Sequence, residues 1–552
     1  MRSETTLTEE MRQRFYAAGR WKDHVLTDYL DRAAARWPAK PAIVDPFRRI
    51  TYGELRPLVD RVAAGFLARG IGPGDVVTVQ LPNWIEFVVA HLALERIGAV
   101  TNSAMTIFRQ AEMRFLLRFA ESKAIVIPST FRRFDHTAMI AELWPELPEL
   151  QHVFVVGDDV PSGMESFRAF MARPWEREAA AEHRRLAGMR RNPDEVVLLI
   201  FTSGTTGEPK GVQHTSNTSL HGSYVMAEAL RMSPDDVLLM PSPIAHATGL
   251  GYGVRLPLML GATMVLQDMW DPEEAARFIA RERCTFTMGA TPFLHGLVGL
   301  ETLAQYDVAS LRFFCCAGAP IPRDLVRRAG ERMPNLMVVP AYGLTECFAH
   351  YITPFDAPTD KVVSTDGRLV NGMEGRIVDD ANQPLPPDQP GEHVCRGATL
   401  FVGYYRRPEA TRAAIDEQGW FHTGDICTSD EDAYLRVVGR KKDLVIRGGI
   451  NISPAEIEDL LFSHPKVQNV AIVGMPDERL GERICAYIVP RGGESLALED
   501  VTGYLRAKGL AVQKLPERIE IVGEFPMTPS GKVQKFKLRE DIARKVGLKH
   551  LV

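Results

Sequence analysis

The sequence has no C-x-x-C pair. Its seven cysteines are spread along 552 residues without the regular spacing that metal sites and disulfide frameworks use. We therefore predict neither a zinc site nor a disulfide framework. A reducing compartment, the cytoplasm, fits this pattern best.

Long apolar runs and a strong charge bias are also missing. Residues 1–15 are polar and charged where a secretory signal needs an apolar stretch of ~7–15 residues. The longest apolar runs, such as residues 196–201, have the length of a strand and fall short of the ~18 residues of a membrane span. A net charge of −5 offers no basic stripe to a nucleic acid. The expected protein is cytoplasmic, spans no membrane and binds no nucleic acid.

The chain is too long for a single hydrophobic core, because cores stop growing near ~250–300 residues. In its first part, short apolar runs alternate with amphipathic helical patterns, which indicates an α/β fold. One unit is clear. Residues 263–267 form an apolar strand, Asp271 and Pro272 cap and begin a helix, and residues 285–291 form the next strand.

The pattern changes after Gly439, where the elements become shorter. Ser453 is the expected N-cap of a helix, with Pro454 at its first position and Glu456 completing a capping box. The elements that follow indicate a small α+β domain of ~100 residues. We expect an α/β fold with a large N-terminal domain of α/β subdomains and a small mobile α+β C-terminal domain. Their bounds are 1–439 and 440–552, with a hinge at 440–443.

A loop rich in glycine and threonine, TSGTTGEPKG, runs from Thr202 to Gly211 directly after an apolar strand. Glycines let the backbone approach an anion, hydroxyls donate hydrogen bonds, and Lys210 adds a positive charge, so the loop is predicted to bind phosphate. It is not a Walker loop, because Gly204, Gly207 and Lys210 are spaced three apart. A flexible surface loop is the alternative.

Five further motifs follow the loop in order along the chain. They are YGLTE at 342–346, TGD at 423–425, GRKKD at 439–443, GGINISPAEIE at 448–458 and PMTPSGKVQK at 526–535. Together with the loop they resemble the signatures of the adenylate-forming superfamily, which includes acyl-CoA synthetases, peptide-synthetase adenylation domains and luciferases. The resemblance implies the fold of that family and a reaction that starts with ATP and a carboxylic acid.

The resemblance implies an ATP site assembled from several motifs. The ring of Tyr342 would stack on adenine, Thr345 and Glu346 would serve the phosphates and Mg²⁺, and Asp425 and Arg440 would hold the ribose. The expected ATP- and AMP-binding residues are Thr202, Ser203, Gly204, Thr205, Thr206, Lys210, Gly318, Ala319, Pro320, Tyr342, Gly343, Thr345, Glu346, Asp425, Arg440 and Lys532. Glu346 is the expected metal ligand. Without the resemblance, Glu346 would be a solvated carboxylate, and Asp425 with Arg440 a structural ion pair.

Two chemical steps are implied. Lys532 would stabilise the negative charge that develops as the carboxylate attacks the α-phosphorus, whereas a basic surface loop is the alternative for this lysine. Thr202, Glu346 and His246 are the other expected catalytic residues. By resemblance the C-terminal domain then rotates about Lys442, and Gly448 and Gly449 come to line the tunnel for coenzyme A. A simple β-turn is the alternative for the two glycines.

The implied acyl pocket is made of small residues. They are His246, Ala247, Thr248, Gly289, Ala317, Ala341 and Gly343. We expect no buried Asp or Arg there to pair with a second charge of the substrate, so an apolar acyl or alicyclic group is favoured. The sequence around these motifs resembles that of cyclohexanecarboxylate-CoA ligases and medium-chain fatty acyl-CoA synthetases. Taken alone, His246 would be a structural histidine.

The leading expectation is an acyl-CoA synthetase that uses ATP, Mg²⁺ and coenzyme A. A ligase that loads the phosphopantetheine of a carrier protein is the first alternative, and luciferase-like oxidation is another. A nucleotide-binding protein without catalysis is disfavoured by intact motif residues, and a serine hydrolase by the lack of a G-x-S-x-G elbow. The exact acid, a homodimeric state, the pathway and regulation by lysine acylation stay open.

Overall fold

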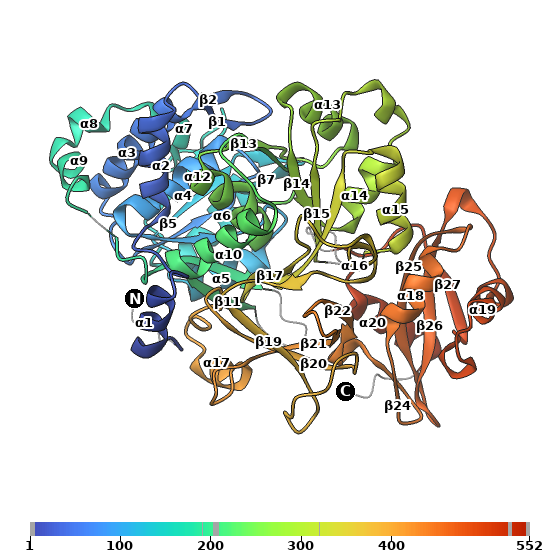
Figure 1. The fold of residues 1–552 in the computed structure, drawn as a ribbon. Helices are drawn as coiled ribbons and strands as arrows, with labels where there is room; N and C mark the ends of the chain where they lie inside the picture. The colour runs from blue at the N-terminus through green and yellow to red at the C-terminus, as the bar shows by residue number, and fades with distance from the viewer. Residues whose placement is uncertain (1–5, 190, 203–208, 319–320, 528–532, 548–552) are drawn as a thin grey trace.

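Figure 1 shows the fold of the protein in a computed structural model, which describes residues 6–189, 191–202, 209–318, 321–527 and 533–547. Within these residues the chain forms nine-, seven-, four- and five-stranded sheets and a short two-stranded ribbon. The first three sheets lie in the large N-terminal part, which we call the body. The five-stranded sheet belongs to the C-terminal domain, at the red end of the colour scale.

The seven-stranded sheet of the body has the order β11-β10-β4-β3-β5-β8-β9. Its pairs are parallel except for β10 with β11, which are antiparallel. The strands are β3 Val76–Val79, β4 Val100–Ser103, β5 Ala124–Pro128, β8 His152–Val156, β9 Glu165–Ser166, β10 Val196–Thr202 and β11 Lys210–Thr215. The predicted apolar strand at 196–201 is therefore β10, and the phosphate loop connects it to the edge strand β11.

The nine-stranded sheet has the order β18-β17-β16-β15-β14-β12-β13-β1-β2. Its strands are β1 Pro41–Val44, β2 Arg49–Thr51, β12 Val237–Met240, β13 Thr263–Leu266, β14 Phe286–Gly289, β15 Phe313–Ala317, β16 Met337–Leu344, β17 Phe348–Ile352 and β18 Arg368–Leu369. The predicted β-α-β unit is confirmed. Its helix α13 (Pro272–Glu282) begins where the Asp271 carboxylate accepts a hydrogen bond from the Glu274 amide at 2.8 Å, and β13 and β14 both pair parallel with β12.

The body also contains helices. They are α1 Glu9–Ala17, α2 Leu26–Arg36, α3 Tyr52–Ala68, α4 Ile85–Ile97, α5 Gln110–Phe119, α6 His136–Leu143, α7 Phe167–Ala172, α8 Trp175–Glu178, α9 Ala180–Leu186, α10 Ser216–Ala229, α11 Ala247–Gly249, α12 Leu256–Leu260, α14 Thr291–Gly299, α15 Arg323–Arg332, α16 Thr359–Ser364 and α17 Pro408–Ala414. A π-helix, η2 (Leu250–Arg255), follows α11 directly. Helix α4 is buried along nearly its whole length because its sequence is apolar on almost every side.

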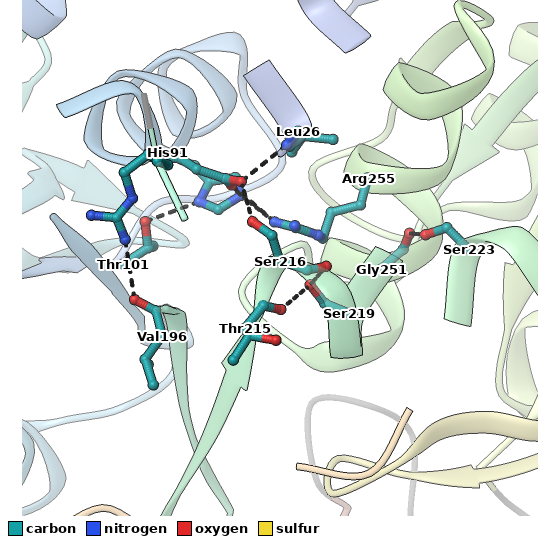
Figure 2. A network of polar contacts seen from close by, with 12 residues as sticks. Leu26, His91, Thr101, Val196, Thr215, Ser216, Ser219, Ser223, Gly251 and Arg255 are labelled. Carbon is teal, nitrogen blue, oxygen red and sulfur yellow. Dashed lines mark hydrogen bonds and ion pairs between the residues drawn. The ribbon is translucent and has the colours of Figure 1, made fainter. Parts of the chain in front are cut away.

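A buried polar network ties η2 to helices α2, α4 and α10 (Figure 2). Glu95 on α4 accepts hydrogen bonds from Arg255 at 3.0 Å, from Ser216 at 3.0 Å and from the Leu26 amide at 3.2 Å. Arg255 and Glu95 are 0 and 1% exposed, and His91 lies beside them. Removing one partner of such a buried pair costs ~3–5 kcal/mol, because the other charge is left unpaired. The network therefore fixes the position of η2.

The four-stranded antiparallel sheet is the part of the body from which the chain enters the C-terminal domain. Its order is β19-β20-β21-β22, with strands β19 Met373–Val378, β20 Gly391–Gly397, β21 Phe421–Ser429 and β22 Leu435–Arg440. Residues 379–390, which are rich in proline, join β19 to β20.

The C-terminal domain packs its own apolar core. Its elements are β23 Val445–Arg447, β24 Ile450–Ile452, α18 Pro454–Phe462, β25 Val467–Asp477, β26 Gly481–Pro490, α19 Leu498–Ala507, β27 Arg518–Ile521 and α20 Lys535–Val546. The core includes Ile457, Leu461, Ile472 and Ile484, all fully buried. A large N-terminal domain and a small α+β C-terminal domain are thus confirmed. The bounds at 439 and 440 stay a prediction.

The predicted capping box at the start of α18 is wrong. Pro454 occupies the first position as expected, but the Ser453 side chain makes no capping hydrogen bond. Its hydroxyl instead donates to the carbonyl of Val438 on β22. Glu456 forms an ion pair with Lys514 at 2.7 Å rather than reaching back to the cap. A tertiary partner has replaced the local one, since the start of α18 lies against β22.

All seven cysteines are buried, and each is a free thiol. None of the helices in the described part of the chain is both long enough and apolar enough to cross a membrane.

Candidate functional site

The hairpin of β16 and β17 presents the YGLTE motif. Tyr342 is buried near the end of β16, and its hydroxyl donates a hydrogen bond to the Asp425 carboxylate at 2.7 Å. Burial, and then the neighbouring Asp425, raise the pKa of Tyr342, so the hydroxyl remains a donor. The rings of His350 and His393 lie 5.2 and 5.7 Å from the tyrosine ring. The tyrosine is therefore held in one orientation, as a platform for a flat base requires; adenine stacking stays a prediction.

Asp425 and Arg440 are brought together by the register of two strands. They are opposite each other on β21 and β22, and Arg440 Nε lies 2.7 Å from Asp425 Oδ1. The carboxylate is buried and also holds the Tyr342 hydroxyl. The ion pair that the sequence offered as an alternative thus exists. It places a carboxylate and a forked donor beside the tyrosine ring, where the predicted ribose contact needs them.

Glu346 lies in the turn after β16 and is only 9% exposed, so the solvated carboxylate considered as an alternative is wrong. Its side chain accepts a hydrogen bond from the Tyr404 hydroxyl at 2.9 Å. Burial raises the pKa of Glu346. A buried carboxylate is a hard oxygen ligand whose charge a divalent cation would stabilise, so the donor chemistry fits Mg²⁺.

The two ends of the phosphate loop lie side by side. Thr202 and Lys210 are paired in the register of β10 with β11, and the Lys210 ammonium lies 4.9 Å from the centre of the Tyr404 ring. Four of the predicted loop residues, Ser203, Gly204, Thr205 and Thr206, lie outside the described residues, as do Ala319 and Pro320. Gly318 follows β15 with φ of 86°, in the left-handed region that favours glycine.

The predicted acyl-pocket residues collect at the carboxyl ends of neighbouring parallel strands. Gly289 ends β14, Ala317 ends β15 and pairs with Ala341 on β16. This edge is where open α/β sheets bind ligands. A Cβ at Gly289 would meet the Phe293 side chain at 2.9 Å, and one at Gly343 would meet the Phe348 carbonyl at 2.0 Å. Packing alone requires these two glycines, so their small size is not evidence of pocket volume.

His246 lies immediately before α11, at the same end of the body. Its Nδ1 accepts a hydrogen bond from the Thr248 amide at 3.4 Å, so the histidine caps the short helix Ala247–Gly249. A structural role is therefore present. The predicted role beside the reacting carboxylate stays a prediction.

The predicted hinge and tunnel residues are in neighbouring turns. Lys442 lies in a 3-10 turn, η4 (Lys441–Asp443), that follows β22 directly. Gly448 and Gly449 form the turn between β23 and β24 with φ of 57° and 82°, a conformation that favours glycine. Lys532, the predicted catalytic lysine, lies outside the described residues.

Two features near the site were missed in the sequence. Tyr404, the hydrogen-bond donor to Glu346, is 58 residues away from it and belongs to no predicted motif. Cys347, His350 and Cys395 bring their ligand atoms within 4.8 Å of one another. Cysteine spacing gave no sign of this cluster. Burial raises the pKa of the Cys347 thiol, and its Sγ lies 3.3 Å from His350 Nδ1, so the cysteine is a buried hydrogen-bonding thiol rather than a thiolate.

The sequence matches known families and is similar to known proteins. Residues 30–405 match the family described as "AMP-binding enzyme", and residues 456–532 match "AMP-binding enzyme C-terminal domain". The Medium-chain fatty-acid–CoA ligase of Escherichia coli (strain K12) is 38% identical over 549 residues, which cover 99% of this chain and 95% of that protein. The mitochondrial Medium-chain acyl-CoA ligase ACSF2 of Homo sapiens is 31% identical, covering 97% and 90%.

Solved structures share the fold over nearly the whole chain. The anthranilate CoA ligase AuaEII in complex with anthranoyl-AMP superimposes with a TM-score of 0.86 at 25% identity, covering 95% of this chain and 98% of that one. ATP-bound MatB from Rhodopseudomonas palustris gives a TM-score of 0.83 at 29% identity, covering 95% and 100%. One of these structures holds an acyl-adenylate and the other holds ATP.

Proposed function

The chain belongs to the AMP-binding enzyme family, and on that premise we propose that it is an acyl-CoA synthetase acting on medium-chain or alicyclic carboxylic acids. It activates the acid with ATP to an acyl-adenylate, releasing pyrophosphate, and then passes the acyl group to coenzyme A, giving acyl-CoA and AMP. The observation that carries the proposal is the meeting of Tyr342, Asp425, Glu346 and Lys210 at one edge of the body, within a match that covers the full chain.

The body would bind ATP through groups that are already in place. The Tyr342 ring offers a face for adenine, and Asp425 with Arg440 offers an acceptor and a forked donor for the ribose hydroxyls. Lys210 lies at the base of the loop that would receive the phosphates. Glu346 would hold Mg²⁺, which when bound neutralises charge on the phosphates.

The remaining steps fall to the C-terminal domain. We assign Lys532 to stabilising the charge that crowds the α-phosphate as the carboxylate attacks it. Rotation about Lys442 would then withdraw Lys532 and bring the Gly448–Gly449 turn to the adenylate, where a turn without side chains leaves room for a pantetheine arm. Two steps with conflicting needs can thus share one site.

Two observations support the proposed class of carboxylic acid substrate: the names of the relatives and the pairing of the buried charge near the predicted acyl pocket. The proteins from Escherichia coli and Homo sapiens named above are both called medium-chain ligases. Arg255, the buried cation at the end of η2, is paired with Glu95 and so offers no free charge to a second carboxylate. An apolar acyl chain or ring is what this end of the body would accept.

The direct test is to incubate the protein with ATP, Mg²⁺, coenzyme A and a panel of alicyclic, aromatic and medium-chain acids, and to identify the products by mass spectrometry. We expect AMP and one acyl-CoA to accumulate in equal amounts. Glu346→Gln, which keeps the side-chain shape and removes its charge, is the matched control and should abolish both products. Acyl-adenylate without acyl-CoA would contradict the assignment of coenzyme A and direct attention to a carrier-protein thiol.

A further inference from the structure

A short segment, residues 398–405, runs along the edge of the seven-stranded sheet; we call it the brace segment. The Val402 amide donates to the Gln213 carbonyl at 3.0 Å, and the Tyr405 amide donates to the Gly211 carbonyl at 2.7 Å. Both acceptors belong to β11, the strand that begins at Lys210. The brace segment thus extends the sheet beside the strand that ends the phosphate loop.

The other side of the brace segment holds the turn that carries Glu346. The Phe401 amide donates to the Glu346 carbonyl at 2.7 Å. Two hydrogen bonds from the N-terminal part of the chain also hold the brace segment. The Trp21 indole donates to the Ala398 carbonyl at 2.9 Å, and the Thr6 amide donates to the Val402 carbonyl at 3.1 Å. These two contacts come from a part of the chain that precedes the family match at residue 30.

Tyr404 joins the two sides with its side chain. It is 6% exposed and packs on the Phe401 ring at 4.8 Å between centroids. Its hydroxyl donates to Glu346 at 2.9 Å, and its ring face lies 4.9 Å from the Lys210 ammonium. A cation within ~6 Å of a ring centre is attracted by the ring quadrupole.

We propose that Tyr404 is a positioning residue of the nucleotide site, which holds the Glu346 carboxylate with its hydroxyl and the Lys210 ammonium with its ring. Both side chains have several rotatable bonds, and fixing them before ATP arrives lowers the entropy that binding must lose. The distance between the cation ligand and the phosphate-binding lysine is then set by the protein rather than by the nucleotide. This inference rests on the proposed function of the same site.

Tyr404→Phe removes only the hydroxyl and keeps the ring under Lys210. We expect the affinity for Mn²⁺ in the presence of ATP, measured from the loss of the free Mn²⁺ signal in electron paramagnetic resonance, to fall roughly 3- to 10-fold. The affinity for ATP without metal, measured by calorimetry, should stay within ~2-fold of the natural protein, because the cation–π contact remains. Tyr404→Leu should weaken both affinities. The split between the two ligands is a result that a merely structural role would not produce.

Tyr405→Phe is the matched control. Tyr405 is the next residue, and its ring packs on Phe119 at 5.8 Å, away from Glu346. The Tyr405→Phe variant should bind Mn²⁺ and ATP with the affinities of the natural protein. Unchanged Mn²⁺ affinity in Tyr404→Phe, or an equal loss in Tyr405→Phe, would overturn the inference. Because binding is the readout, failure of the natural protein to make any acyl-adenylate would refute the proposed function and leave this result intact.

Discussion

The body and the C-terminal domain are stabilised by different kinds of interior. The body buries ionised and polar groups, such as the Glu95–Arg255 pair and the Tyr342–Asp425 contact of the site. It also holds all seven tryptophans and twelve of the fourteen histidines. The main core of the C-terminal domain is aliphatic, with residues such as Ile457 and Ile484 fully buried.

This difference suits the proposed roles of the two parts, a fixed body and a C-terminal domain that rotates. Buried polar networks are satisfied in one arrangement only, so they fix the parts of the body that contain them. The C-terminal domain has its own aliphatic core, so its fold does not depend on its position relative to the body. Its contacts with the body include a pair between Arg436 and Asp459 at 3.6 Å, with both side chains partly exposed. Pairs of that kind contribute ~0–1 kcal/mol and do not oppose rotation strongly.

The largest expected effect comes from removing the catalytic charge that the C-terminal domain would bring. Lys532→Ala should lower acyl-adenylate formation by ~10²–10³-fold, because a positive charge at the developing anion is lost. Pyrophosphate exchange measures this step. Thioester formation from supplied acyl-adenylate should be retained, because the proposed rotation would by then have moved Lys532 away. Lys537→Ala, at an exposed position on α20, is the control. An equal loss of both steps would remove the assigned role.

A smaller effect is expected from stiffening the connection between the two parts. Lys442→Pro fixes φ within η4, so the second step should slow by roughly tenfold or more while adenylation stays within ~2-fold. Rapid-quench measurement of the two half-reactions separates them. Lys442→Ala removes the side chain and leaves the backbone free, and so distinguishes the side chain from the hinge. Normal thioester turnover in Lys442→Pro would end the hinge assignment.

The smallest effect concerns acid stability. Burial lowers the pKa of His91 and of His214 to about 4, so both are neutral in the folded body. In the unfolded chain they take up a proton below pH ~6.5. Their contribution to stability is therefore complete above pH 6.5 and is lost as the pH falls towards 4, at ~1 kcal/mol per pH unit for each.

Tryptophan fluorescence isolates this effect, because the C-terminal domain contains no tryptophan. Urea unfolding followed at pH 7.5 and 5.5 should show the body losing stability, and His91→Gln should reduce that loss by about one histidine's share. His183→Gln, on helix α9, is the control. The C-terminal domain, followed by hydrogen exchange, should change less than the body. Equal losses in both parts would contradict the contrast drawn between their interiors.

Local chemistry made much of the fold predictable. Asp271 and Pro272 predicted the start of α13 because a carboxylate cap and a first-turn proline act within one turn of the chain. Ser453 failed by the same logic, since its hydroxyl found the Val438 carbonyl across the boundary between sheet and helix. A sequence pattern can predict a local hydrogen bond, but it cannot show that a group distant in the sequence will bind the same hydroxyl instead.

The site divides in the same way. Tyr342, Glu346, Asp425 and Arg440 were predicted because they lie in recognisable motifs, and the structure brings Tyr342 to Asp425 and Asp425 to Arg440. Tyr404 has no motif that points to Glu346; a brace segment that crosses from one sheet to another creates the contact. Glycines 289 and 343 were interpreted as pocket volume, whereas the structure gives a packing reason for each.

Strand β22 ends at Arg440, and the 3-10 turn with Lys442 begins at the next residue. Rotation displaces each atom in proportion to its distance from the axis. If the axis passes through this turn, a large swing barely shifts the guanidinium that would hold the ribose, while the outer parts of the domain travel far. The AMP portion would then stay seated throughout the catalytic cycle, so the intermediate has no interval in which to escape into water and hydrolyse.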